Sequence, residues 1–295
     1  MKIDTHQHYW RYHAADFPWI SDTMPALRRD HLPGDSQPAM QVCGVDAVVA
    51  VQARCQSDET DFLLALAAQH PYIVGVVGWV DLMQPDLAAR LEAWAGQSAL
   101  CGFRHILQDE PDLAAVIAAT SFNDSLRLLQ QRQLVYDVLV FGHQLPLAVA
   151  VCARHEAHWL VLDHVGKPAV RDWLADASVA QRWRASLREL GAMPHVVCKL
   201  SGLVTEADWQ HGGGLSAADE GVILTCFDEA LAVFGPDRLM FGSDWPVCQL
   251  AAAYDAVAGL AQRWAQSRLS RPEQQAFWAG NAVRCYGLPV PTPAQ

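Results

Sequence analysis

The chain has 295 residues, of which 52% are hydrophobic and 18% charged, so its composition is that of a folded globular protein and excludes intrinsic disorder. Its formal net charge of −11 and the absence of any basic run exclude the electrostatic surface of a nucleic-acid-binding protein, which leaves small molecules as the expected partners. No apolar run reaches the roughly 18 residues of a membrane span, and the polar first residues lead us to expect a protein that is neither exported nor membrane-bound.

Eight short apolar or β-branched runs alternate along the chain with longer stretches of helical period. Each run is short enough for a strand buried on both faces, and the runs cover residues 2–5, 45–52, 73–80, 100–105, 134–140, 159–163, 195–200 and 238–242. The helical stretches include residues 59–70, 85–97, 122–131, 144–154, 179–190 and 217–234, with a terminal helix over 272–286. This order predicts an α/β fold, a (β/α)8 barrel with a C-terminal helix. No linker divides the chain, so we expect a single domain over residues 1–295.

The 8 cysteines are scattered and include no CxxC pair. A chain of this size needs no disulfides for stability, so reduced thiols and a cytoplasmic location are expected. The sequence leaves the oligomeric state open, a homo-oligomer included.

The chemistry of such a barrel lies where the strands end, because the loops that leave their C-terminal edges converge on one mouth. Polar residues follow nearly every predicted strand. Those that end the second to eighth strands include Gln52, Arg54, Trp79, Arg104, His105, Asp137, Asp163, His164, Lys199 and Asp244. Polar loops are common in any barrel, so the residue types carry more weight than the pattern.

Two histidines, His6 and His8, end the first strand with a spacing that points both rings to the same side. His164 ends a middle strand and Asp244 ends the eighth. Three strands therefore supply three histidines and one carboxylate. Such a set either coordinates one zinc-like ion with an open position for water, or orients and deprotonates a water without any ion.

These residues resemble the amidohydrolase superfamily, and within it the sugar-lactonase branch, which includes L-fuconolactonases and L-rhamnonolactonases. The similarity is greatest to the L-fuconolactonases. The segments that carry it are residues 3–10, 49–54, 75–82, 102–111, 162–164, 198–202 and 241–246. The resemblance implies a (β/α)8 barrel that opens a sugar lactone, L-fuconolactone or a similar L-sugar lactone, to the aldonic acid. It also implies that Asp244 is the general base toward water.

Binuclear members of the superfamily bridge two metals with a carboxylated lysine or a glutamate at the end of the fourth strand. The three lysines of this chain are Lys2, Lys167 and Lys199, and none stands there. We therefore expect either one divalent ion, with zinc as the first choice of metal, or no ion. Some relatives in the lactonase branch are thought to work without metal, so both alternatives stay open.

In the expected mechanism Asp244 accepts a proton from water, with the ion held by His6, His8, His164 and Asp244 where one is present. Arg104, His105 and His164 are the expected donors to the oxyanion, with Lys199 able to join them. The residues expected to bind substrate are Gln52, Arg54, Trp79, Gln108, Lys199, Trp10, Trp245 and His31, the last in a long first loop that could cover the mouth.

Two other functions are compatible with the same residues. A metal-dependent decarboxylase or hydratase of the superfamily also uses the HxH pair, a mid-barrel histidine and a strand-eight aspartate. A sugar-binding barrel without turnover is the alternative from another class. The polar and tryptophan-rich strand ends favour a polyol over an aromatic acid.

Overall fold

The computed structural model describes residues 1–173, 176–209 and 215–289, and within them eight strands form one sheet. The strands follow one another in chain order, each parallel to the next. They are β1 (Ile3–Gln7), β2 (Ala47–Val51), β3 (Ile73–Gly78), β4 (Leu100–Phe103), β5 (Val135–Val138), β6 (Leu160–Leu162), β7 (Val196–Leu200) and β8 (Leu239–Phe241). All eight predicted strands are confirmed, and all but the first are shorter than the segments expected.

The sheet closes between β1 and the residues that follow β8. The backbone N–H of Asp244 donates to the carbonyl oxygen of His6 at 2.9 Å, and that of His8 donates to Trp245 at 2.7 Å. These bonds complete a nearly closed (β/α)8 barrel, which confirms the predicted fold class. They also bring the ends of the first and last strands together.

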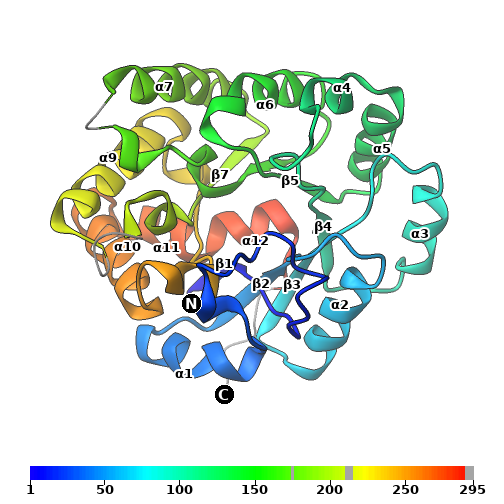
Figure 1. Ribbon diagram of the computed structural model, residues 1–295, viewed down its shortest axis with the longest axis horizontal. Helices are drawn as coiled ribbons and strands as arrows, with labels where there is room; N and C mark the ends of the chain where they lie inside the picture. The colour runs from blue at the N-terminus through cyan, green and yellow to red at the C-terminus, as the bar shows by residue number, and fades with distance from the viewer. Residues whose placement is uncertain (174–175, 210–214, 290–295) are drawn as a thin grey trace.

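All the helices except the last surround the strands on the outside (Figure 1). The helices of the described chain are α1 (Pro33–Cys43), α2 (Glu59–Gln69), α3 (Leu87–Ala93), α4 (Leu113–Ala118), α5 (Thr120–Gln131), α6 (Leu145–Cys152), α7 (Ala177–Gly191), α9 (Ala217–Phe234), α10 (Tyr254–Arg268), α11 (Arg271–Gln275) and α12 (Asn281–Tyr286). The strands are almost entirely buried, because helices cover their outer face and the barrel interior covers the other. None of the helices in the described ranges is long and apolar enough to cross a membrane.

The sequence did not single out α1, α4 or α10. Helix α1 contains Pro38, and proline disfavours a helix interior because it lacks the N–H donor. The single terminal helix expected over 272–286 is corrected to α11 and α12, separated by a π-helical turn at Ala276–Gly280.

An apolar cluster joins interior-facing strand residues to α12 and Leu288. Its members include Ile3, Val49, Val77, Val161, Val197, Met240, Ala282, Cys285, Tyr286 and Leu288. Helix α12, in red, lies across the middle of the ring of helices (Figure 1). The polar groups described next gather at the C-terminal ends of the strands.

Candidate active site

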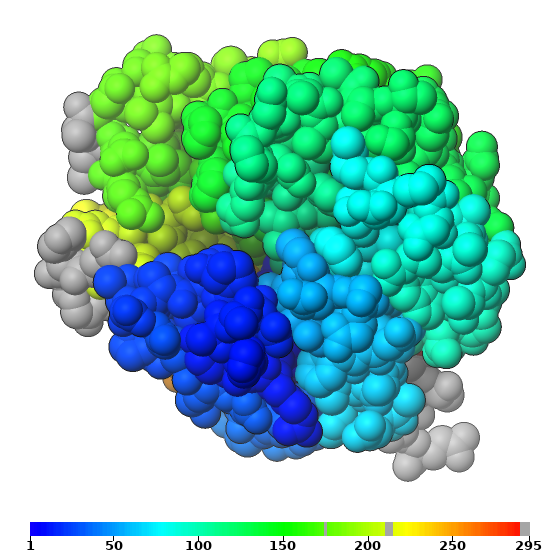
Figure 2. Space-filling model, turned by 45° about the vertical axis from the view of Figure 1, so that its right-hand side comes forward, coloured from blue at the N-terminus to red at the C-terminus, as the bar shows by residue number. Residues whose placement is uncertain are grey.

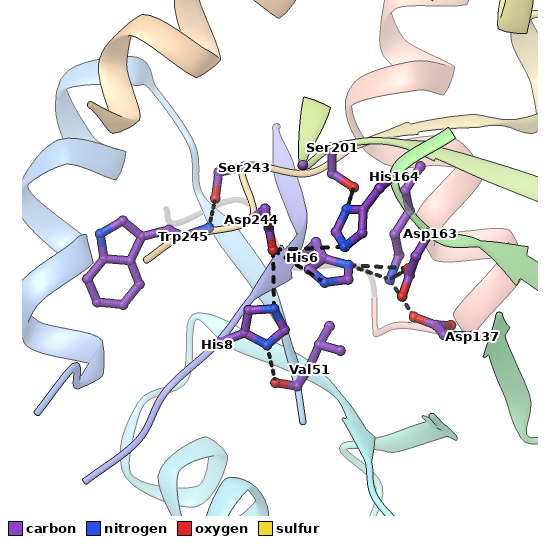
Figure 3. A network of polar contacts seen from close by, with 12 residues as sticks. His6, His8, Val51, Asp137, Asp163, His164, Ser201, Ser243, Asp244 and Trp245 are labelled. Atoms are coloured by element: carbon purple, nitrogen blue, oxygen red, sulfur yellow. Dashed lines mark hydrogen bonds and ion pairs between the residues drawn. The ribbon is translucent and has the colours of Figure 1, made fainter. Parts of the chain in front are cut away.

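His6 and His8 converge at the end of β1, as the HxH spacing predicted (Figure 3). The pairing of β1 with β2 shifts register between Asp4 and Gln7. His6 contacts Arg104 and Asp163, which directly follow β4 and β6, and Lys199 of β7. The two ring centroids are 4.9 Å apart. Both side chains are buried, with His6 completely inaccessible to solvent.

Asp244 has a strained backbone whose hydrogen bonds hold its carboxylate beside these rings. Its φ of 60° lies in a region that residues other than glycine rarely adopt. Its N–H donates to His6, and its carbonyl oxygen accepts from the N–H of Cys248 at 2.9 Å. The preceding residue, Ser243, donates its N–H to the buried carboxylate of Asp4 at 2.8 Å. The strain is therefore supported from both sides of the residue.

His164 begins a left-handed turn that follows β6. Residues 164 to 167 have φ values of 56°, 52°, 69° and 46°. The ring of His164 packs against Gly202, where an added Cβ would lie 2.4 Å from Nδ1. Nδ1 is 2.9 Å from Ser201 Oγ. Backbone conformation and close packing together place His164 beside His6, with ring centroids 4.5 Å apart.

One carboxylate oxygen, Asp244 Oδ1, faces all three histidines. It lies 3.2 Å from Nε2 of His8, 3.8 Å from Nε2 of His6 and 4.0 Å from Nε2 of His164. Burial alone would raise the pKa of the Asp244 carboxyl, but His164, His8 and His6 bring it below its ordinary value. Burial lowers the pKa of His164 to about 4 and that of His6 well below its usual range, so these rings are neutral at pH 7.

The hydrogen-bond partners of His8 are compatible with a cation between His8 and Asp244. Its Nδ1 lies 2.9 Å from the carbonyl oxygen of Val51, which can only accept, so Nδ1 carries a proton. In the neutral ring, Nε2 then presents a lone pair to Asp244 Oδ1 at 3.2 Å. Two acceptors at this distance repel each other unless a proton or a metal ion is shared between them. Neutral imidazoles and a carboxylate are the ligands that zinc prefers.

Two overlapping groups have ligand atoms within 4.8 Å of one another: His6, His8 and Asp244, and His6, Asp163 and His164. The second group already holds protein cations. Asp163 lies 2.9 Å from Arg104 Nη1 and 3.2 Å from Lys199 Nζ, whereas Asp244 of the first group forms no ion pair with either cation in the described part of the chain. The first group is therefore the better candidate for a single ion.

Lys199 forms a buried ion-pair network below the histidines. Its Nζ lies 2.5 Å from Asp137, 3.2 Å from Asp163 and 3.2 Å from His6 Nδ1. Burial would lower the pKa of Lys199, but Asp137 and Asp163 raise it above its ordinary value. The hydroxyl of Tyr286 also donates to Asp137. Lys199 thus interacts with the histidine site from within the barrel.

A cavity of about 450 Å³ opens from this site. Its polar wall comprises His8, Arg104, Gln108, Asp109, His164, Lys167, Arg171, Thr205, Glu206 and Asp244, and its apolar wall includes Trp19, Met24, Ile106, Leu139, Phe141, Trp209, Val247 and Leu250. Figure 2 shows the N-terminal segment, in blue, beside a hollow that also borders green segments. The mixture of aromatic and hydrogen-bonding side chains suits a small polar ring.

The structure brings five of the predicted site residues to this cavity: His8, Arg104, Gln108, His164 and Asp244. Two others, His6 and Gln52, contact those residues from behind, and Lys199 in turn contacts His6. Gln52 accepts from Arg104 Nη2 through its side-chain and backbone oxygens, at 3.0 and 2.7 Å. Gln52 and Lys199, expected to touch substrate, therefore position other side chains.

Two further residues predicted for the site, Arg54 and His105, have other partners and are not among the described residues that line the cavity. Arg54 donates to Glu59 at 2.7 Å and pairs with Asp58. His105 accepts from the N–H of Leu82 and lies 2.8 Å from Glu110. Local carboxylates therefore contact both side chains, and the oxyanion role expected of His105 stays a prediction.

Four more residues predicted to bind substrate, three tryptophans and His31, contact other parts of the protein. Trp10, His31 and Trp245 form edge-to-face ring contacts in which His31 lies between the two indoles. Trp79 is held by Thr60 through its backbone. None of the four lines the cavity among the described residues. The long first loop has its own apolar core, which buries Trp10, whereas Trp19 of the same loop lines the cavity.

Sequence reasoning missed several residues of the site. Asp4 stands two residues before His6, and this spacing could have identified it as part of the site. Lys167 and Glu206 line the cavity from loops after β6 and β7. No local pattern marks these two, because their proximity depends on the barrel.

Comparisons with known proteins give related amidohydrolases and lactonases. The family model described as amidohydrolase matches residues 3–288 of this chain. The chain is 56% identical to the L-fucono-1,5-lactonase of Burkholderia multivorans, covering 100% of this chain and 99% of that protein. It is 33% identical to the L-fucono-1,5-lactonase of Burkholderia ambifaria, covering 99% and 97%.

Solved structures of amidohydrolases are also similar to this chain. A crystal structure of an amidohydrolase from Burkholderia multivorans with bound HEPES has a TM-score of 0.95 and 57% identity, covering 98% of this chain and all of that one. Another crystal form with bound zinc has a TM-score of 0.94 and 56% identity, with the same coverage. Amidohydrolase 2 from Bifidobacterium longum subsp. infantis, at 20% identity and a TM-score of 0.68, shares the fold.

Proposed function

The chain belongs to the amidohydrolase family, and we propose that it hydrolyses the ring ester of a sugar lactone to the aldonic acid. The proposed substrate is L-fucono-1,5-lactone or a similar L-sugar lactone, because both Burkholderia relatives are named for that activity. The observation that carries the proposal is the Asp244 carboxylate, which faces the cavity beside three histidine rings.

In the proposed reaction Asp244 accepts a proton from water while the water oxygen bonds to the lactone carbonyl carbon. The pKa of Asp244 lies below its ordinary value, so the carboxylate is ionised at neutral pH, as a proton acceptor must be. Arg104 and His164, which line the same cavity, are the donors proposed for the oxyanion. When the ring C–O bond breaks, Asp244 returns its proton to the leaving ring oxygen. The new carboxylic acid then ionises and releases one proton.

His6, His8 and Asp244 would hold one divalent ion, and zinc suits their donor atoms. His164, also predicted as a ligand, lies 4.0 Å from the same Asp244 oxygen. When bound, such an ion supplies Lewis acidity at the carboxylate end of the cavity. The crystal structure of the relative with bound zinc supports this choice of metal.

The proposal is tested by proton release from a panel of aldonolactones led by L-fucono-1,5-lactone, measured above the spontaneous rate. We expect turnover by the parent and a loss of at least about a thousandfold in kcat for Asp244→Asn. The matched control is Asp86→Asn, an exposed carboxylate at the start of α3. No turnover of any lactone would overturn the proposal, and carbon dioxide release from a dihydroxybenzoate would then favour a decarboxylase. Lactone binding without turnover would favour a sugar-binding barrel.

A further inference from the structure

Lys167 stands in the cavity wall between two polar partners from other loops. Its Nζ donates to Gln108 Oε1 at 3.2 Å and lies 3.4 Å from Glu206 Oε1. It also lies 4.7 Å from the centroid of the Phe141 ring. All four residues line the cavity. The side chains of Lys167 and Glu206 are 18% and 13% exposed, so the pair is largely withdrawn from water.

The backbone that presents Lys167 is the left-handed turn that also presents His164. The turn is closed by the Lys167 N–H, which donates to the carbonyl oxygen of His164 at 2.8 Å. Val165 within it has a positive φ, a costly conformation for a β-branched residue. Val165 is completely buried, and its carbonyl oxygen accepts from Trp183 Nε1 at 2.8 Å. Tertiary contacts thus maintain a strained turn that directs both His164 and Lys167 into one cavity.

The partners of Lys167 are themselves held in place. Arg171 donates to the backbone carbonyl oxygens of Thr205 and Glu206, at 3.3 Å each. The side-chain amide of Gln144 donates to the carbonyl oxygen of Gln108 at 3.1 Å. Gln108, Lys167 and Glu206 therefore come from the loops after β4, β6 and β7, respectively.

The charge of this group indicates what it binds. An unpaired lysine in a cavity would attract anions, but here Glu206 neutralises Lys167. The ammonium offers N–H donors and the carboxylate offers acceptor oxygens, so together they match a hydroxyl, which both donates and accepts. A neutral polyhydroxylated ring is therefore a better ligand than a carboxylate.

We propose that Lys167, held by Gln108 and Glu206, is a specificity-determining residue that binds a ring hydroxyl of the lactone. The inference rests on the proposed function, because it assumes that the substrate is a sugar lactone. Lys167 takes no part in proton transfer, so its loss weakens substrate binding and leaves the chemical step intact.

The test compares L-fucono-1,5-lactone with its 2-deoxy, 3-deoxy and 4-deoxy analogues, using the parent, Lys167→Met and Glu206→Gln. For the full lactone we expect each variant to raise KM about tenfold or more and to keep kcat within about twofold. For one deoxy analogue, parent and variants should have equal KM, because the hydroxyl that Lys167 binds is absent. Arg188→Met and Glu189→Gln, exposed on α7, are the matched controls.

Circular dichroism and thermal melting check that each variant is folded. If Lys167→Met fails to fold, Glu206→Gln carries the same test. The inference is overturned, and the proposed function stands, if the parent turns over the lactones and the folded variants have the same ratios of KM as the parent among the full lactone and its three deoxy analogues. Absence of turnover by the parent overturns both.

Discussion

The buried carboxylate of Asp4 accepts a hydrogen bond from the backbone N–H of Ser243 at 2.8 Å, and thereby joins the first strand to the residue that precedes Asp244. The same Oδ1 accepts from the N–H of His6 at 3.1 Å. A single side chain thus sets the position of His6 relative to that of Asp244.

Replacing Asp4 with alanine should disrupt both stability and activity. The N–H groups of His6 and Ser243 would lose their acceptor in a buried environment, so we expect the free energy of unfolding to fall by about 3 kcal/mol. The displaced Asp244 should lower kcat/KM about a hundredfold. Asp4→Asn keeps an acceptor oxygen and should have the smaller effect. Urea unfolding and lactone turnover measure both quantities, with Asp86→Ala as control; parent-like values for Asp4→Ala would contradict the interpretation.

Gly202 provides the space that the His164 ring occupies. In Gly202→Ala the new Cβ would lie 2.4 Å from His164 Nδ1, and the residue would have to keep a φ of 67°. We expect a loss of stability of about 1–3 kcal/mol and a fall in kcat/KM of at least about tenfold. Gly96→Ala is the matched control, because nothing lies within 4 Å of its Cβ position. An unchanged kcat/KM in Gly202→Ala would show that the His164 position is unimportant.

Lys199 should contribute to stability through the buried carboxylates that it pairs. Lys199→Met would leave Asp137 and Asp163 with less compensation inside the barrel, which should cost about 3–5 kcal/mol. Adding Asp137→Asn removes one of the two buried charges and should restore part of that loss. A double-mutant cycle measured by denaturant unfolding tests the coupling. Additive losses in the double variant would argue against the ion pair.

Zinc should stabilise the protein through His6, His8 and Asp244. A bound ion at 100 times its Kd raises the free energy of unfolding by about 2.7 kcal/mol, so the melting temperature should rise when zinc is added to chelator-treated protein. His8→Asn should lose this rise and the zinc retained after gel filtration, whereas His143→Asn, at an exposed position, should keep both. Equal zinc retention by the two variants would place the ion elsewhere.

His155 should make stability depend on pH. It is 1% exposed, its Nε2 contacts Asn123 at 2.9 Å, and burial lowers its pKa to about 4. The unfolded chain, with a histidine pKa near 6.5, therefore takes up a proton before the folded chain does, and stability falls as the pH drops from about 6.5 toward 4. At pH 5 this amounts to about 2 kcal/mol.

His155→Gln should lose less stability than the parent between pH 7 and pH 5. The measurement is the free energy of unfolding of both proteins at each pH. The exposed His143→Gln is the control. A variant that loses as much stability as the parent between these two pH values would exclude His155 as a source.

The fold follows from local sequence patterns. Strands such as Ala47–Val51 and helices such as Thr120–Gln131 were predictable because hydrophobic periodicity is a local property. Their alternation determined the barrel, and the barrel in turn predicted that His6, His8, His164 and Asp244 would converge, since the C-terminal strand ends meet at one mouth.

Tertiary structure decided which polar side chains reach the cavity. Lys199 lies near the end of a strand as the sequence predicted, yet it pairs inside the barrel with Asp137 of β5 and with Asp163, which follows β6. Lys167 and Glu206 meet only because the loops after β6 and β7 are adjacent. Strand ends are determined by local sequence, whereas side-chain partners depend on contacts between segments distant in the chain.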